Sequence, residues 1–207
     1  MSIIMNLKKA FSDITELLEI LYQDREEILK LSRDIVRDCS IAIKSVHRKE
    51  FDKFHKRMNA VKVKHADLLN LVNKNPGIFF KYLKTPEQEF AESISFYSII
   101  SDEEIPSPFE LKINPINFLL GLADVIGELR RYALDNIRNS RVKDLNSILE
   151  NMDTIYNYLF TLDYPGGVTQ DLRHKVDIAR NLIEKTRGDI SLAIQMDDLK
   201  KCFEKNL

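Results

Sequence analysis

The chain has 207 residues and a formal net charge of −1, so its surface as a whole does not attract phosphates. Any nucleic-acid binding must then come from a local basic face. Because no apolar run is long enough to span a bilayer and the N-terminus has no signal-peptide core, we expect a cytoplasmic protein with no membrane segment.

Helical periodicity predicts three helices in the first third of the chain, over about residues 4–22, 24–48 and 50–73. The breaker Asn75-Pro76-Gly77 ends the third. A fourth helix is expected to open at Thr85 as N-cap, with Pro86 in the first turn and Gln88 completing a capping box.

The fourth helix is expected to end near Ser101, before the irregular segment DEEIPSPFELKINP. Further helices are predicted over about 115–140, 142–161 and 169–187, with Gly188 separating a C-terminal helical tail. No segment alternates strictly between polar and apolar residues, so strands are not required. The sequence predicts an all-α fold, a bundle of about seven helices in a single domain over residues 1–207.

Two acids mark the helix expected after Pro115. Asp124 and Glu128 are the only charged residues of INFLLGLADVIGEL, and their spacing of four places them on one helix face. Gly121 and Gly127 flank that face, although each costs about 1 kcal/mol against Ala in a helix. The glycines indicate a close approach beside the acids. The competing interpretation is a plain solvent stripe, made of Asn117, Asp124, Glu128, Arg131 and Asp135.

The helix over 85–101 carries a second acidic pair in QEFAESISF. Glu89 and Glu92 are three residues apart and share a face, which continues into Phe96 and Ile100. A carboxylate against such a surface must be paired, protonated or bound to a metal. A buried salt bridge to an arginine is the alternative. Four carboxylates without His or Cys form an all-oxygen ligand set, which suits Mg²⁺, Mn²⁺ or Ca²⁺ better than Zn²⁺.

A basic stripe follows the helix over 24–48. Arg33, Arg37, Lys44 and Arg48 fall within about 60° of one another on a helix of 3.6 residues per turn. Asp34 is expected on a different face, so that it does not neutralise the stripe. Such a stripe is suited to following a phosphate backbone, and the alternative is a solvated face with local ion pairs.

Four blocks in order resemble the translin family, and its TRAX branch in particular. They are LSRDIVRDCSIAIKSVHR, QEFAESISF, LLGLADVIGELRRYALDNI and the late segment DYPGGVTQDLRHKVDIARNLIEKTRGDI. The resemblance covers almost the whole chain and implies the all-α translin-type fold. It also implies a hollow oligomer, typically an octamer, which a chain of this type would form with itself.

For function, the resemblance implies a Mg²⁺-dependent endoribonuclease acting on RNA inside the oligomer. Carried over to this sequence, the acids that hold the metal and perform the catalysis are Glu89, Glu92, Asp124 and Glu128. Single-stranded RNA is the expected ligand, with DNA as a second one. The expected lining of the lumen is basic, formed by Arg33, Arg37, Lys44 and Arg48, with Arg130 or Arg131 near the acids. The alternative is a translin-like protein that binds RNA or DNA and cuts neither.

Overall fold

The computed structural model describes the backbone of residues 2–205 and the side chains of residues 6–204. Every regular element in this described part is helical, which confirms the all-α prediction. No helix of the described part is long and apolar enough to cross a membrane.

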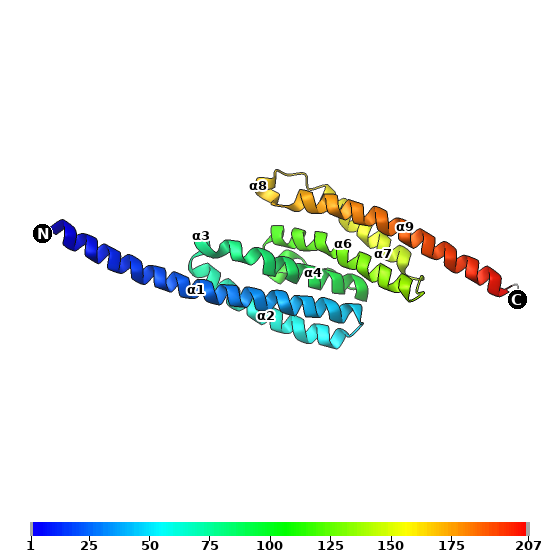
Figure 1. Ribbon diagram of the computed structural model, residues 1–207, viewed down its shortest axis with the longest axis horizontal. Coiled ribbons are helices and arrows are strands. Elements are labelled where there is room, and N and C mark those ends of the chain that lie inside the picture. Colours follow the sequence, from blue (N-terminus) through cyan, green and yellow to red (C-terminus); the bar gives the residue numbers. More distant parts are fainter. Residues whose placement is uncertain (1, 206–207) are drawn as a thin grey trace.

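The helices form a layered bundle (Figure 1). The long helix α1 (Ser2–His47) pairs with α2 (Phe51–Lys74), and α1 packs on α4 (Lys84–Ser101). Helix α4 lies against α6 (Pro115–Arg138) at the centre, and α6 contacts both α7 (Leu145–Phe160) and α9 (Leu172–Lys205). The core runs through these interfaces, so the acid-bearing helices α4 and α6 occupy the middle of the molecule.

Short helical turns fill the connections. Helices α3 (Pro76–Phe79) and η1 (Phe80–Leu83) lead into α4, α5 (Pro108–Leu111) precedes α6, and α8 (Gly166–Thr169) precedes α9. Within the segment expected to be irregular, α5 opens with a capping box between Ser107 and Glu110. Asn114 caps α6 by accepting from the backbone N–H groups of Ile116 and Asn117.

Two predicted boundaries and one predicted cap are wrong. The helices expected over 4–22 and 24–48 are one helix, α1, because no glycine or proline interrupts the junction. Helix α9 passes through Gly188, since one glycine weakens a helix without breaking it. Thr85 caps nothing: the residues before α4 are already helical, so no free N–H groups await a cap there.

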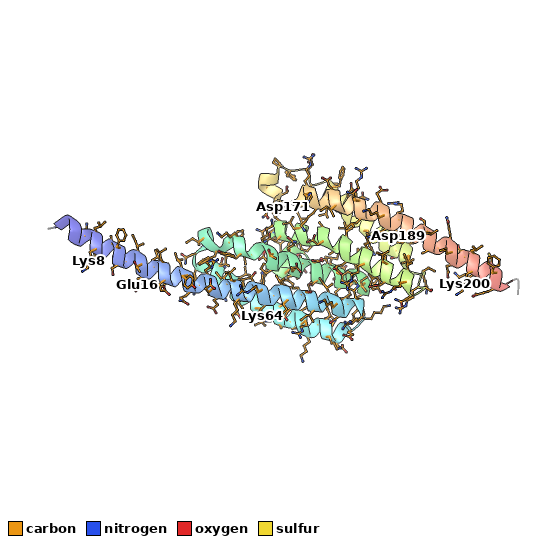
Figure 2. All side chains as sticks on the ribbon, viewed as in Figure 1. Lys8, Glu16, Lys64, Asp171, Asp189 and Lys200 are labelled. Atoms are coloured by element: carbon orange, nitrogen blue, oxygen red, sulfur yellow. The ribbon has the colours of Figure 1, made fainter. Side chains whose placement is uncertain are left out.

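Both long helices extend beyond the bundle. The N-terminal part of α1 projects from one end and the C-terminal part of α9 from the other (Figure 1). Figure 2 shows Lys8 and Glu16 on the first projection and Lys200 on the second. The side chains of residues 6–20 are all exposed, so α1 is solvated there along its whole circumference.

Candidate active site

The two acidic pairs lie on two helices that touch, α4 and α6. A Cβ added to Gly121 on α6 would overlap the backbone oxygen of Gln88 and lie 2.8 Å from Ala91 Cβ, both on α4. Glycine at this position therefore lets the two backbones come into contact. The glycines predicted a close approach beside the acids. At Gly121 the group that approaches is the neighbouring helix α4. Nothing in the described chain lies within 4 Å of a Cβ added to Gly127.

Both oxygens of Asp124 are engaged. Gln88 Nε2 donates to Asp124 Oδ2 at 2.6 Å, and Lys175 Nζ on α9 donates to Asp124 Oδ1 at 2.5 Å. Gln88 is thus a partner of the acidic site, in place of the capping role predicted for it. Asp124 is held between α4 and α9.

Glu128 is bound to the last turn of α1. Its Oε2 lies 2.5 Å from Nε2 of His47, whose side chain is only 7% exposed, and 3.7 Å from the Arg131 guanidinium. His47 also packs against Phe96, with ring centroids 4.8 Å apart, which fixes the imidazole in place. Glu128 is therefore positioned by a histidine whose side chain is almost completely buried.

Glu89 and Glu92 have no such partners. Within residues 6–204 neither side chain makes a hydrogen bond or an ion pair, which leaves the proposed buried salt bridge to an arginine without support. Burial, followed by repulsion from Glu89, Asp124 and Glu128, raises the pKa of Glu92 to about 8. Burial and then Asp124 also raise the pKa of Glu89, against an opposing effect of Lys175. The four acids therefore share one electrostatic environment.

The donor chemistry of this cluster fits a hard divalent cation. All four groups are carboxylates, and the pKa values of Glu89 and Glu92 are raised first by burial and then by the negative charge of their neighbours, which a cation would compensate. Among the described side chains, however, no three His, Cys, Asp or Glu groups are gathered closely enough to hold a metal ion as they stand. Lys175 and His47 take up oxygens of Asp124 and Glu128 instead.

A basic pocket adjoins the acids. It measures about 470 Å³ and lies between the C-terminal ends of α1 and α6. Three of the predicted basic residues line it, namely Lys44, Arg48 and Arg131. Lys49, Arg138 and Arg141 add three cations that sequence patterning did not single out, and Asp135 is the one acid in the lining. His47 and Arg131 belong to the pocket and also contact Glu128, so the pocket begins at the acidic cluster.

The first half of the basic stripe lies elsewhere on α1. Arg33 and Arg37 line a separate groove with Lys81 and Tyr82 of η1. Arg37 also pairs with Asp34 at 2.8 Å, so the prediction that Asp34 leaves the stripe unneutralised is wrong. A residue three positions earlier on a helix lies within reach of a long side chain. Arg130 binds α9 instead: its guanidinium lies 2.9 Å from Asp189 and donates a hydrogen bond to Thr186.

Asn117 does not belong to a solvent-exposed stripe, because it is buried and bonded to Glu87. Asn117 is 3% exposed and donates from Nδ2 to Glu87 Oε2 at 2.8 Å. The buried Glu87 carboxylate also accepts from the backbone N–H of Asn114 and contacts His65 Nε2 at 3.0 Å. These bonds join α2, α4 and the start of α6, which sets the position of the acid-bearing helix.

Comparison with known proteins gives one consistent result. Residues 23–187 match the model of the Translin family. An uncharacterized protein of Methanocaldococcus jannaschii is 43% identical over 183 residues, which cover 87% of this chain and 81% of that protein. The translin-associated protein X homolog of Schizosaccharomyces pombe is 24% identical, over 88% of this chain and 86% of the relative.

Solved structures agree in fold. The AfC3PO–duplex RNA complex superposes with a TM-score of 0.82 at 29% identity, over 90% of this chain and 97% of that one. Apo-NeC3PO superposes with a TM-score of 0.81 at 21% identity, over 88% of this chain and 96% of that one.

Proposed function

Because the chain belongs to the translin family, we propose that it is a cytoplasmic, magnesium-dependent endoribonuclease that works as a homo-oligomer. Single-stranded RNA is the substrate we expect, and DNA is a further ligand. The solved AfC3PO complex contains duplex RNA, so assays should compare both forms of RNA. An octamer is the expected size of the assembly.

One observation carries the proposal: the cation-rich pocket and the acidic cluster share Arg131 and His47 as a common border. Within residues 6–204, four of the pocket's cations make no ion pair, namely Lys44, Arg48, Lys49 and Arg141. The helix ends at the pocket contribute only about −0.5 charge each. The pocket therefore has cationic charge to spare for phosphates, and a strand bound there passes the acids.

Glu89, Glu92, Asp124 and Glu128 are the residues that would hold Mg²⁺ in this proposal. When bound, Mg²⁺ neutralises charge on a phosphate and makes water a better nucleophile. The chain's own groups position the acids. His47 holds Glu128, Gln88 orients Asp124, and Lys175 supplies a local positive charge that occupies Asp124 while no other cation does.

Glu128→Gln tests the proposal most directly. We expect the purified protein to cleave labelled RNA only with Mg²⁺ or Mn²⁺, and the variant to lose at least about 100-fold in rate with unchanged RNA affinity by fluorescence anisotropy. Glu150→Gln, an exposed change on α7, is the matched control. Cleavage that persists in EDTA, or a variant as active as the parent, contradicts the proposal.

The second candidate is a binding protein that does not cut. It is favoured by the engagement of Asp124 by Lys175 and by the lack of a three-ligand group among the described side chains. A silent binder would retain RNA through the pocket and show no Mg²⁺-dependent turnover in any variant. Lys175→Met separates the two candidates further: freeing Asp124 should strengthen Mg²⁺ binding to a metal site, measured by titration calorimetry, and leave a pure binder unaffected.

A further inference from the structure

The arm of α1, defined as residues 7–20, carries an apolar stripe that its own chain does not cover. Leu7, Phe11, Ile14 and Leu18 are 57%, 64%, 50% and 58% exposed. They are spaced four, three and four residues apart, which is the a/d pattern of a coiled coil. The arm precedes the part of the chain that matches the family model, residues 23–187.

The same spacing continues into the bundle, where its apolar positions are covered. Counting on with the same spacing leads to Leu21, which packs against the core, then to the exposed Arg25, and from there to the buried Ile28, Ile35 and Val46. Inside the bundle this face of α1 is covered by α2 and α4. Most of the stability of a helix in a protein comes from packing of its apolar face. The arm therefore presents an uncovered apolar face that is suited to a helical partner.

The stripe is symmetric about its midpoint, between Ser12 and Asp13. In an antiparallel pair with a second copy, Leu7 lies level with Leu18 of the partner subunit. Phe11 lies level with Ile14 of the partner subunit. Every layer then combines an a position with a d position, as antiparallel coiled coils require, and the arrangement closes with two-fold symmetry.

Charge and space favour the antiparallel orientation. On a helix with 100° per residue, Lys8 and Glu19 lie about 20° apart, on the same edge of the stripe. Antiparallel pairing brings Lys8 beside Glu19 of the partner subunit, twice by symmetry. A parallel pair would bring the two bundles together, because the same face at Ile28 is already covered by its own chain. In the antiparallel pair the bundles lie at opposite ends.

We propose that the arm binds the arm of a second copy of this chain as an antiparallel two-helix coiled coil. This contact lies outside the acidic cluster and the basic pocket. It is independent of whether the protein cuts RNA, and a failure of either proposal leaves the other standing.

Disulfide cross-linking reads the orientation directly. In a Cys202→Ser background, the variant Leu7→Cys/Leu18→Cys should form a covalent dimer under mild oxidation, seen on a non-reducing gel. Leu7→Cys alone and Leu18→Cys alone should not, because each residue then faces a leucine of the partner subunit. These two positions are about 16 Å apart along one helix, too far for a bond within the chain. Cross-linking of either single variant, or none in the double variant, overturns the proposal.

Charge reversal supplies a second, independent readout on the same cysteine pair. Lys8→Glu should lower the cross-linking rate several-fold because it places two acids together, and Glu19→Lys should do so by placing two cations together. Combining both reversals should restore the rate, since the pair is re-formed with exchanged signs. A combined variant as slow as the single ones contradicts the pairing of Lys8 with Glu19 of the partner subunit.

Discussion

The Glu92 carboxyl is buried and is repelled by the charges of three other acids, so its protonation contributes to the stability of the fold. The unfolded chain loses this proton near pH 4.5, whereas the folded chain keeps it to a pKa of about 8. Stability is therefore greatest below pH 4.5 as far as this group is concerned, and it falls as the pH rises from there to about 8. Glu92→Gln removes this loss of stability at high pH, because glutamine does not ionise.

We expect Glu92→Gln to leave the melting temperature nearly unchanged at pH 4.5 and to raise it by roughly 4 °C or more at pH 9. Circular dichroism melts of both proteins at the two pH values measure this. Glu150→Gln, exposed on α7, should show no such pH-dependent gain. An equal gain at both pH values would assign the effect to packing instead of ionisation.

Metal binding to the acidic cluster should depend on the same proton. Because Glu92 is protonated at neutral pH, a cation must displace its proton, and the apparent affinity for Mg²⁺ should rise between pH 6 and pH 9. Calorimetric titrations across this range measure the dependence, which should flatten in Glu92→Gln. An affinity that is constant with pH in the parent protein would remove Glu92 from the ligand set.

The four acids could be identified individually from the sequence, but the side chains that contact Asp124 and Glu128 could not. Asp124 and Glu128 stood out because they interrupt an apolar helix. Lys175 lies 51 residues from Asp124 and belongs to another helix, so no local spacing indicates their contact. His47 was visible beside Lys44 and Arg48, but its burial against Phe96 follows from the packing of α1 on α4.

At the scale of the helices, the α4–α6 contact depends on Gly121. Gly121→Ala would force a methyl group against the backbone of α4, where neither helix has room to give. We expect it to destabilise the protein by about 2 kcal/mol in spite of alanine's better helix propensity. Because the contact also aligns the two acidic pairs, activity should fall with stability.

Gly127→Ala is the matched control for this prediction. A Cβ there meets nothing within 4 Å in the described chain, so alanine should stabilise α6 by up to about 1 kcal/mol. Urea denaturation of both variants measures the contrast. Equal effects of the two substitutions would mean that the helix approach at Gly121 is not tight in solution.

The helices were largely predictable from periodicity, and so were several of their ends: α4 ends at Ser101 and α6 begins at Pro115, as predicted. Asn75-Pro76 marked the end of α2 correctly, because proline cannot continue that helix. The predicted break in α1 near residue 23 was wrong. The residues there are mostly charged, but none is a glycine or proline, so the helix continues. Asn117 is buried because it donates to Glu87, an acid that belongs to α4, so its position could not be predicted from α6 alone.

For the whole molecule, a net charge of −1 coexists with the basic pocket. Phosphate binding at this pocket should make RNA affinity fall steeply with salt. Each lost contact to a single strand should lower the slope of log affinity against log salt by about 0.7. We expect Lys49→Ala/Arg141→Ala to reduce the slope by about 1.4 in anisotropy titrations. Lys62→Ala, exposed on α2, should leave it unchanged.

Helix α1 packs in the bundle and, because it is unbroken, also fixes the distance and direction of the arm relative to the bundle. No glycine or proline separates the exposed arm from the segment that ends at His47 beside Glu128, and α1 is helical throughout. The azimuth of the arm is therefore locked to that of the acidic cluster, about 40 Å away along the axis from Leu21 to His47. One residue inserted at the junction would swing the arm by about 100°, whereas seven would lengthen it by about 10 Å and nearly keep its phase.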